Sequence, residues 1–102
     1  TLPNIVHPNA FVSPRAILGN GCMVMANAVI GTEARLGDGV IVNAGAIVDH
    51  HAVVDDFGHL GVNASMAGGA HLGRGAWAQA GVALGYGVSI PEKQILKPGE
   101  SR

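Results

Sequence analysis

The strongest constraint on the fold of this chain is an apolar residue at every sixth position from residue 6 to residue 96. The register never slips, and these residues are Val6, Val12, Leu18, Val24, Ile30, Leu36, Val42, Val48, Val54, Leu60, Met66, Leu72, Ala78, Leu84, Ile90 and Leu96. A small or modest side chain stands four residues after most of them, as at Ala10, Cys22, Ala28, Ala46 and Ala64. A period of six fits neither the spacing of an amphipathic helix nor the alternation of a simple strand. It indicates short strands separated by tight turns and repeated along the whole chain.

Three such units close a triangular coil, and successive coils stack at the spacing of β-strands. The sequence therefore predicts an all-β parallel β-helix of about five coils and about 24 Å in height. The large and the small residue of each hexad point inward. Glycine often follows the large residue, as at Gly31 and Gly61, and we expect it there because a Cβ would disfavour the turn conformation. The repeat spans residues 6–96, preceded by a lead-in of residues 1–5 and followed by a basic tail of residues 97–102.

The composition predicts an oligomer. Only 13% of the chain is charged, about half the usual share in a soluble domain, and 48% is hydrophobic. A thin prism cannot bury all of these side chains, so the residues before the inward positions should form an exposed apolar ridge: Phe11, Ile17, Met23, Val29, Ile41, Ile47, Val53 and Trp77. Contiguous apolar surface of that extent usually marks an interface. We expect a cyclic homo-oligomer, specifically a homotrimer.

The charge and the cysteine count exclude several classes of function. A formal net charge of −1 gives no reason to expect nucleic acid or an anionic membrane as a partner. We expect neither a secretory leader nor a membrane span. The single cysteine, Cys22, occupies an inward position and cannot form a disulfide within the chain, which favours a cytoplasmic location.

Polar residues of chemical interest cluster after Val48. Residues 18 positions apart stack in neighbouring coils, so His50 lies below Gly68, and His51 lies between Glu33 and Gly69. The two glycines offer no side chain and leave room for a ligand. A histidine beside such a space is a candidate general base, because its ordinary pKa lies near operating pH.

A carboxylate near this base would orient the ring and stabilise the imidazolium, and Asp49 and Glu33 are the candidates. His59 stacks against Trp77 on the apolar ridge and could donate to a ligand oxygen, or it could make a structural hydrogen bond at an interface. His50 and His51 are adjacent on a strand-like corner and point to different sides, which is poor geometry for chelation. We expect no metal.

The hexads resemble those of the hexapeptide-repeat acyltransferases, which are left-handed parallel β-helix trimers that bind acetyl-CoA between subunits. The segments 43–50, 56–59 and 67–69 resemble the branch of sialic-acid O-acetyltransferases and UDP-4-amino-sugar N-acetyltransferases. This resemblance implies that His50 is the general base and that His59 contacts the acetyl end of acetyl-CoA. It implies direct transfer to the amine or hydroxyl of a sugar or nucleotide-sugar acceptor, without an acyl-enzyme.

The same resemblance assigns the remaining ligand contacts. Backbone amides at Gly68 and Gly69, or His59, would stabilise the oxyanion. The pantetheine arm would follow the ridge past Trp77, and Arg74 and Lys93 would meet the phosphates.

Two features depart from the family pattern. A carboxylate commonly follows the catalytic histidine, whereas here the next residue is His51, so Asp49 or Glu33 takes over the orienting role. The family also carries an N-terminal nucleotide-sugar-binding domain of Rossmann-like type, so we expect either the β-helix half of a larger enzyme or a stand-alone β-helix. The alternative function is a non-catalytic trimeric scaffold. A γ-class carbonic anhydrase is disfavoured, because no two histidines are 36 residues apart.

Overall fold

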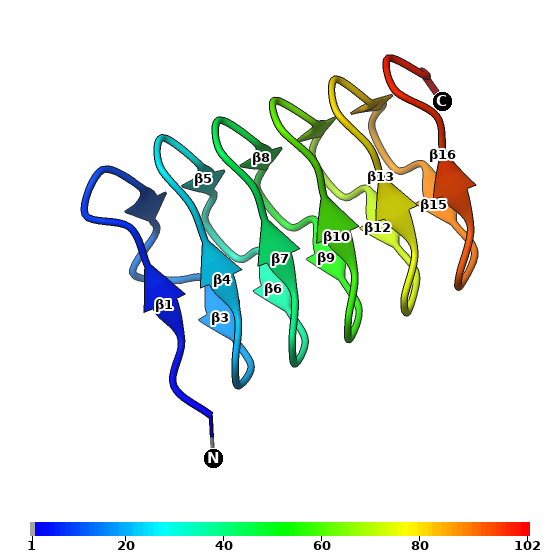
Figure 1. Cartoon of the computed structure of the whole chain (residues 1–102). Coiled ribbons are helices and arrows are strands. Elements are labelled where there is room, and N and C mark those ends of the chain that lie inside the picture. The colour runs from blue at the N-terminus through cyan, green and yellow to red at the C-terminus, as the bar shows by residue number, and fades with distance from the viewer. Residues whose placement is uncertain (1) are drawn as a thin grey trace.

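The computed structural model describes residues 2–102 as a stack of short parallel strands joined by tight turns (Figure 1). In residues 2–102 there is no helix long and apolar enough to cross a membrane. The strands are β1 (Ile5–Val6), β2 (Phe11–Val12), β3 (Ile17–Leu18), β4 (Met23–Val24), β5 (Val29–Ile30), β6 (Arg35–Leu36), β7 (Ile41–Val42), β8 (Ile47–Val48), β9 (Val53–Val54), β10 (His59–Leu60), β11 (Ser65–Met66), β12 (His71–Leu72), β13 (Trp77–Ala78), β14 (Ala83–Leu84), β15 (Ser89–Ile90) and β16 (Ile95–Leu96).

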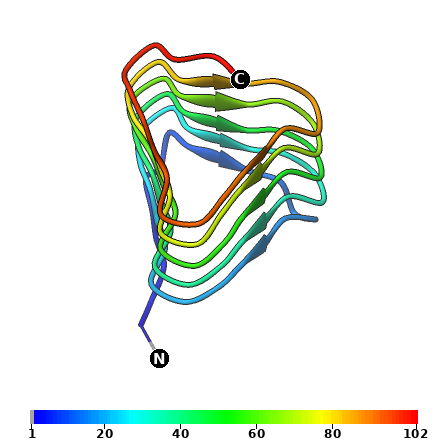
Figure 2. The ribbon, with the colours of Figure 1, turned by 90° about the vertical axis from the view of Figure 1, so that its right-hand side faces the viewer.

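Every third strand pairs in parallel, which produces three sheets that form the sides of a triangular prism (Figure 2). Sheet A contains β1, β4, β7, β10, β13 and β16; sheet B contains β2, β5, β8, β11 and β14; sheet C contains β3, β6, β9, β12 and β15. The register is 18 residues throughout, so that His59 pairs with Ile41 on one side and with Trp77 on the other. We call the turns that join these sheets the AB, BC and CA corners. The predicted left-handed parallel β-helix of about five coils is confirmed.

The interior of the prism contains the two predicted inward positions of each hexad. The larger residues, such as Val24, Ile30 and Leu60, and the smaller ones, such as Ala28 and Ala46, are all fully buried. The first coil is the exception, because it has a neighbour on one side only, and Val6 is 43% exposed.

The glycines that follow the large residues are required for a different reason from the predicted one, which was the turn conformation. A Cβ at Gly31 would lie 2.8 Å from the backbone nitrogen of His50, and one at Gly61 would lie 2.7 Å from that of Ala80. These glycines are therefore needed because two coils approach closely there. Left-handed backbone occurs two residues later in the turn, for example at His51, where φ is 60°.

The outward apolar residues form three columns, which corrects the expectation of one ridge. Residues six apart lie on different sheets, and only those 18 apart stack. The column on sheet A is the longest, and its members are Ile5, Met23, Ile41, His59, Trp77 and Ile95. Ile47 is on sheet B, and Val53 stacks between Arg35 and His71 on sheet C.

The ends of the repeat extend slightly beyond residues 6–96. Ile5 is already part of β1. At the other end, Ser101 forms a parallel bridge with Ala83, and the Gly85 amide donates to the Arg102 carbonyl at 3.0 Å. Residues 97–102 thus continue the last coil along sheet B.

Candidate active site

The predicted base, His50, lies on the BC corner in the turn between β8 and β9, and its side chain is exposed. Its ring lies directly over Gly68 of the next coil, since a Cβ at Gly68 would be 2.5 Å from Nε2 and in contact with Cε1. The predicted stacking of these two residues is confirmed. The space above Gly68 is filled by the imidazole itself, whereas a Cβ at Gly69 would meet no atom within 4 Å. Open space for a ligand therefore lies at Gly69.

The polar contact of the His50 ring is with its neighbour in sequence. Nδ1 of His50 lies 3.2 Å from Nδ1 of His51, and the two rings are nearly perpendicular, at 81°. The carboxylates expected to orient His50 have other partners. Asp49 Oδ1 accepts a hydrogen bond from the backbone N–H of His50 at 2.8 Å, and Glu33 Oε1 pairs with Nε of Arg15 at 2.6 Å.

One of the predicted oxyanion donors is also engaged. The Gly69 amide donates to the carbonyl of His50 at 3.1 Å, as part of the stacking between coils. Left-handed backbone at Gly69, with φ of 72°, fits the preference of glycine for such turns. Of the predicted donors, the Gly68 amide and His59 are the ones left for a ligand.

The predicted contacts for acetyl-CoA other than Gly68 and Gly69 are on sheet A and the CA corner. The His59 and Trp77 rings stack with their centroids 5.2 Å apart and their planes at 11°. Burial lowers the pKa of His59, because a charged imidazole loses hydration there. Lys93 is an exposed turn residue of the CA corner in the last full coil.

Arg74 of the CA corner has partners that the sequence analysis did not predict. Its Nη1 donates to Asp56 Oδ2 at 3.3 Å, and its guanidinium lies 5.1 Å from the centroid of the Phe57 ring. Asp56 Oδ1 in turn accepts from the Asp38 amide (2.8 Å).

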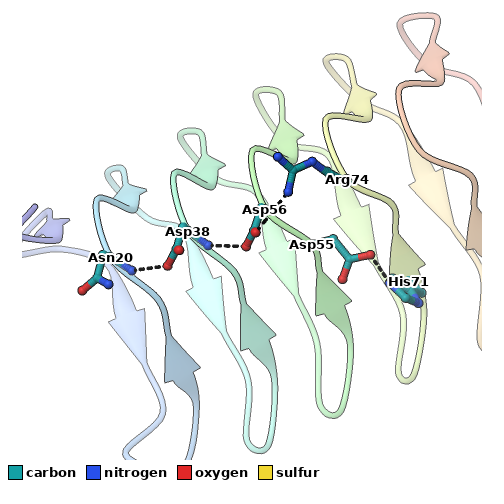
Figure 3. Close-up of polar contacts among 6 residues, drawn as sticks. All are labelled: Asn20, Asp38, Asp55, Asp56, His71 and Arg74. Atoms are coloured by element: carbon teal, nitrogen blue, oxygen red, sulfur yellow. Dashed lines mark hydrogen bonds and ion pairs between the residues drawn. The ribbon is translucent and has the colours of Figure 1, made fainter. Parts of the chain in front are cut away.

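This chain of contacts begins one coil earlier, where the Asn20 amide donates to Asp38 Oδ1 at 2.9 Å (Figure 3). The 18-residue spacing of Asn20, Asp38, Asp56 and Arg74 was visible in the sequence and could have predicted this ladder. Beside the ladder, Asp55 Oδ2 lies within hydrogen-bond distance of His71 Nε2, at 2.8 Å.

A hollow of about 230 Å³ lies at the C-terminal end of this ladder and is lined by Asp55, Asp56 and Arg74. Within residues 2–102, no group of three or more His, Cys, Asp or Glu side chains is arranged to hold a metal ion.

The two halves of the predicted site lie on opposite sides of the prism. His50, Gly68 and Gly69 belong to the corner between sheets B and C, whereas His59 and Trp77 belong to sheet A. In a triangular cross-section a corner is opposite the third side (Figure 2). One chain therefore does not bring the predicted base and the predicted acetyl-CoA contacts together.

Comparison with known proteins defines the class of this β-helix. The family described as bacterial transferase hexapeptide (six repeats) matches residues 15–50. No curated protein sequence matches at a significant level. The chain is a hexapeptide-repeat β-helix, and the resemblance to the hexapeptide-repeat acyltransferases is confirmed.

Solved structures similar to this chain include acetyltransferases, one of which is a sugar N-acetyltransferase. A histidine-to-alanine variant of GDP-perosamine N-acetyltransferase from Caulobacter crescentus, in complex with CoA and GDP-perosamine, is 37% identical over 99% of this chain, with a TM-score of 0.98. The acetyltransferase domain of PglB from Neisseria gonorrhoeae, in complex with acetyl-CoA, is 36% identical over 92% of the chain, with a TM-score of 0.78. The chain covers 48% of the first protein and 54% of the second, so it spans about half of their length.

Proposed function

We propose that this chain is the β-helix part of an acetyl-CoA-dependent acetyltransferase whose acceptor is the amine or hydroxyl of a sugar or nucleotide sugar. The observation that carries this proposal is the likeness over 99% of the chain to a sugar N-acetyltransferase crystallised with CoA and a nucleotide sugar. That likeness favours an amine as the acceptor group. Acetyl-CoA supplies an activated acetyl thioester, and the chain supplies the base and the binding surface.

The proposed base is His50, because its imidazole is exposed on the BC corner beside the open space at Gly69. As the acceptor nitrogen or oxygen attacks the thioester carbonyl, His50 takes the proton at Nε2. The new C–N or C–O bond forms, the C–S bond breaks, and the proton passes to the departing thiolate of CoA. The Gly68 amide and His59 are the proposed donors to the carbonyl oxygen, where negative charge develops.

Transfer is direct in this proposal, and the position of Cys22 supports it. The chain has one cysteine, which is fully buried inside the prism. Its Sγ lies 3.1 Å from the Gly37 carbonyl, and burial raises the pKa of the thiol. A buried thiol with a raised pKa is a poor nucleophile, so a covalent acetyl-cysteine on this chain is disfavoured.

A homotrimer is the assembly that completes this site. Because His50 and the His59–Trp77 pair lie on opposite sides of one prism, an acetyl-CoA that reaches both must lie between two subunits. The BC corner of one subunit would then face sheet A of its neighbour. The exposed apolar column of sheet A supports this contact, since Ile5 is 58% and Ile95 59% exposed. Side-chain exposure at Arg74, 57%, is compatible with its proposed contact to phosphate.

Titration of the folded chain with acetyl-CoA by calorimetry tests the proposal. We expect saturable binding with one site per subunit, retained by His50→Ala and weakened by Trp77→Ala. Phe11→Ala is the control, because it removes an exposed aromatic side chain of sheet B at the other end of the stack and should leave binding unchanged. Acetyl transfer to GDP-perosamine or a UDP-4-amino sugar then tests catalysis. Absence of binding by a folded trimer would favour the scaffold.

A further inference from the structure

The contact between His50 and His51 carries a specific inference about the base. Their Nδ1 atoms are 3.2 Å apart, and a hydrogen bond between two imidazole nitrogens requires that one donates and the other accepts. When His50 holds a proton at Nε2 as well, both of its nitrogens are donors. The direction is then fixed: His50 Nδ1–H donates to Nδ1 of a neutral His51.

The carboxylates of Asp49 and Glu33 are not placed to accept the Nδ1–H hydrogen bond of His50. Asp49 Oδ1 caps the amide of His50, and Glu33, which lies one coil before His51, pairs with Arg15. Among residues 2–102, His51 is the side chain that hydrogen-bonds the His50 ring. The ring is confined on its other side by Gly68, so His51 and Gly68 together fix its orientation.

The backbone at His51 is a second observation. Its φ of 60° lies in the left-handed region, where a residue with a Cβ is held under strain. The equivalent turn position in the next coil is Gly69, with φ of 72°, so glycine meets the demands of this turn. A histidine here is not explained by the needs of the turn.

We propose that His51 is the positioning residue of the base: it accepts the Nδ1–H hydrogen bond of His50 and thereby keeps His50 Nε2 free to take the acceptor's proton. The inference rests on the proposed function for its catalytic consequence, whereas the hydrogen bond can be tested without it. In this proposal His51 acts through His50.

The first test measures the tautomer of His50 in this chain by two-bond ¹⁵N–¹H correlations of the histidine rings at neutral pH. We expect Nδ1–H in the wild type and a shift toward Nε2–H in His51→Gly. Glycine suits the left-handed turn, so the variant should be at least as stable as the wild type. Asn27→Gly is the matched control, because Asn27 has the same left-handed backbone, with φ of 62°, in the AB corner, and it should leave the His50 tautomer unchanged.

The second test measures acetyl transfer to the amino-sugar nucleotide. His51→Gly should lower kcat about tenfold, the effect of one lost hydrogen bond, and should leave KM for acetyl-CoA unchanged. His51→Glu should restore kcat, because a carboxylate is a stronger acceptor, and Glu33 shows that glutamate adopts this backbone, at φ of 60°.

The outcomes separate the inference from the function on which it rests. An unchanged His50 tautomer or unchanged kcat in His51→Gly overturns the inference, even if the chain transfers acetyl groups. If His51→Gly loses the Nδ1–H tautomer of His50 but the wild-type chain binds no acetyl-CoA, the hydrogen bond is supported and the proposed function is overturned. Equal losses of kcat in His51→Gly and Asn27→Gly would attribute the effect to the turns and contradict the inference.

Discussion

The BC and CA corners are built from the same repeat, but they use polar side chains in opposite ways. On the CA corner, the side-chain oxygens of Asp38 and Asp56 accept from the amides of Asn20 and Asp38 in the preceding coils. On the BC corner, the His50 ring contacts its own neighbour, His51, and the residue above it is Gly68. A side chain that binds the backbone of an adjacent coil stabilises the stacking of the two coils. The His50 ring is bounded by glycine and hydrogen-bonded at Nδ1, which suits the proposed role of its Nε2 as the base.

Removal of the base is expected to have the largest effect. His50→Ala should reduce kcat by about 10²- to 10⁴-fold, the usual contribution of general base catalysis. Acetyl-CoA affinity should stay the same, because none of the proposed acetyl-CoA contacts is made by the His50 side chain. Steady-state kinetics and calorimetry measure the two quantities, and a variant that keeps full kcat would assign the base to another residue.

Displacement of the base without its removal should have the next largest effect. Gly68→Ala places a Cβ against Cε1 and Nε2 of His50, so the ring must move, and we expect kcat to fall by about tenfold or more, since small misplacement of a catalytic group is costly. Gly87→Ala, one coil further along, is the control.

The control separates geometry from stability. At Gly87 a Cβ meets nothing within 4 Å and φ is +66°, so that substitution should cost about 1 kcal/mol of stability and leave kcat unchanged. Equal kcat values for the two variants would show that Gly68 does not determine the position of His50.

Disruption of the CA ladder should affect stability. Asp56→Ala removes the acceptor for the Asp38 amide and the partner of Arg74, and it should lower the free energy of unfolding by about 1–2 kcal/mol. Asp56→Asn keeps one oxygen acceptor and should cost less. Chemical denaturation of the two variants measures the difference, and identical midpoints for Asp56→Ala and the wild type would show that the ladder is not stabilising.

The smallest expected effect is the pH dependence due to His59. Burial lowers its pKa below the ordinary value of 6.5, so the unfolded chain binds the proton at higher pH than the folded chain does. The contribution of His59 to stability is then full above pH 6.5 and is lost as the pH falls through 6.5 toward the lower pKa of the folded state. His59→Gln should weaken the fall in Tm over this range. Parallel Tm curves for the variant and the wild type would contradict the assignment.

The architecture was predictable because the repeat is strict. The 18-residue register follows from three hexads per coil, and the pairing of His59 with Trp77 was predicted correctly. The grouping of His50 with the His59–Trp77 pair depends on a neighbouring subunit, and it stays a prediction. His50 and His59 differ by nine residues, which is half a coil, and this places them on opposite sides of the prism.

The sequence by itself determined the β-helix, its register, its buried positions and the stacking of His50 on Gly68, because backbone hydrogen bonds between equivalent residues repeat wherever the hexad repeats. The tertiary structure decided which polar atoms meet. Asp49, Glu33 and His51 were all near His50 in the register, and competition placed Asp49 on an amide, Glu33 on Arg15 and His51 on the ring. The physical reason is that each donor and acceptor binds whichever partner it can reach at the right distance and angle, and spacing along the chain does not fix that choice.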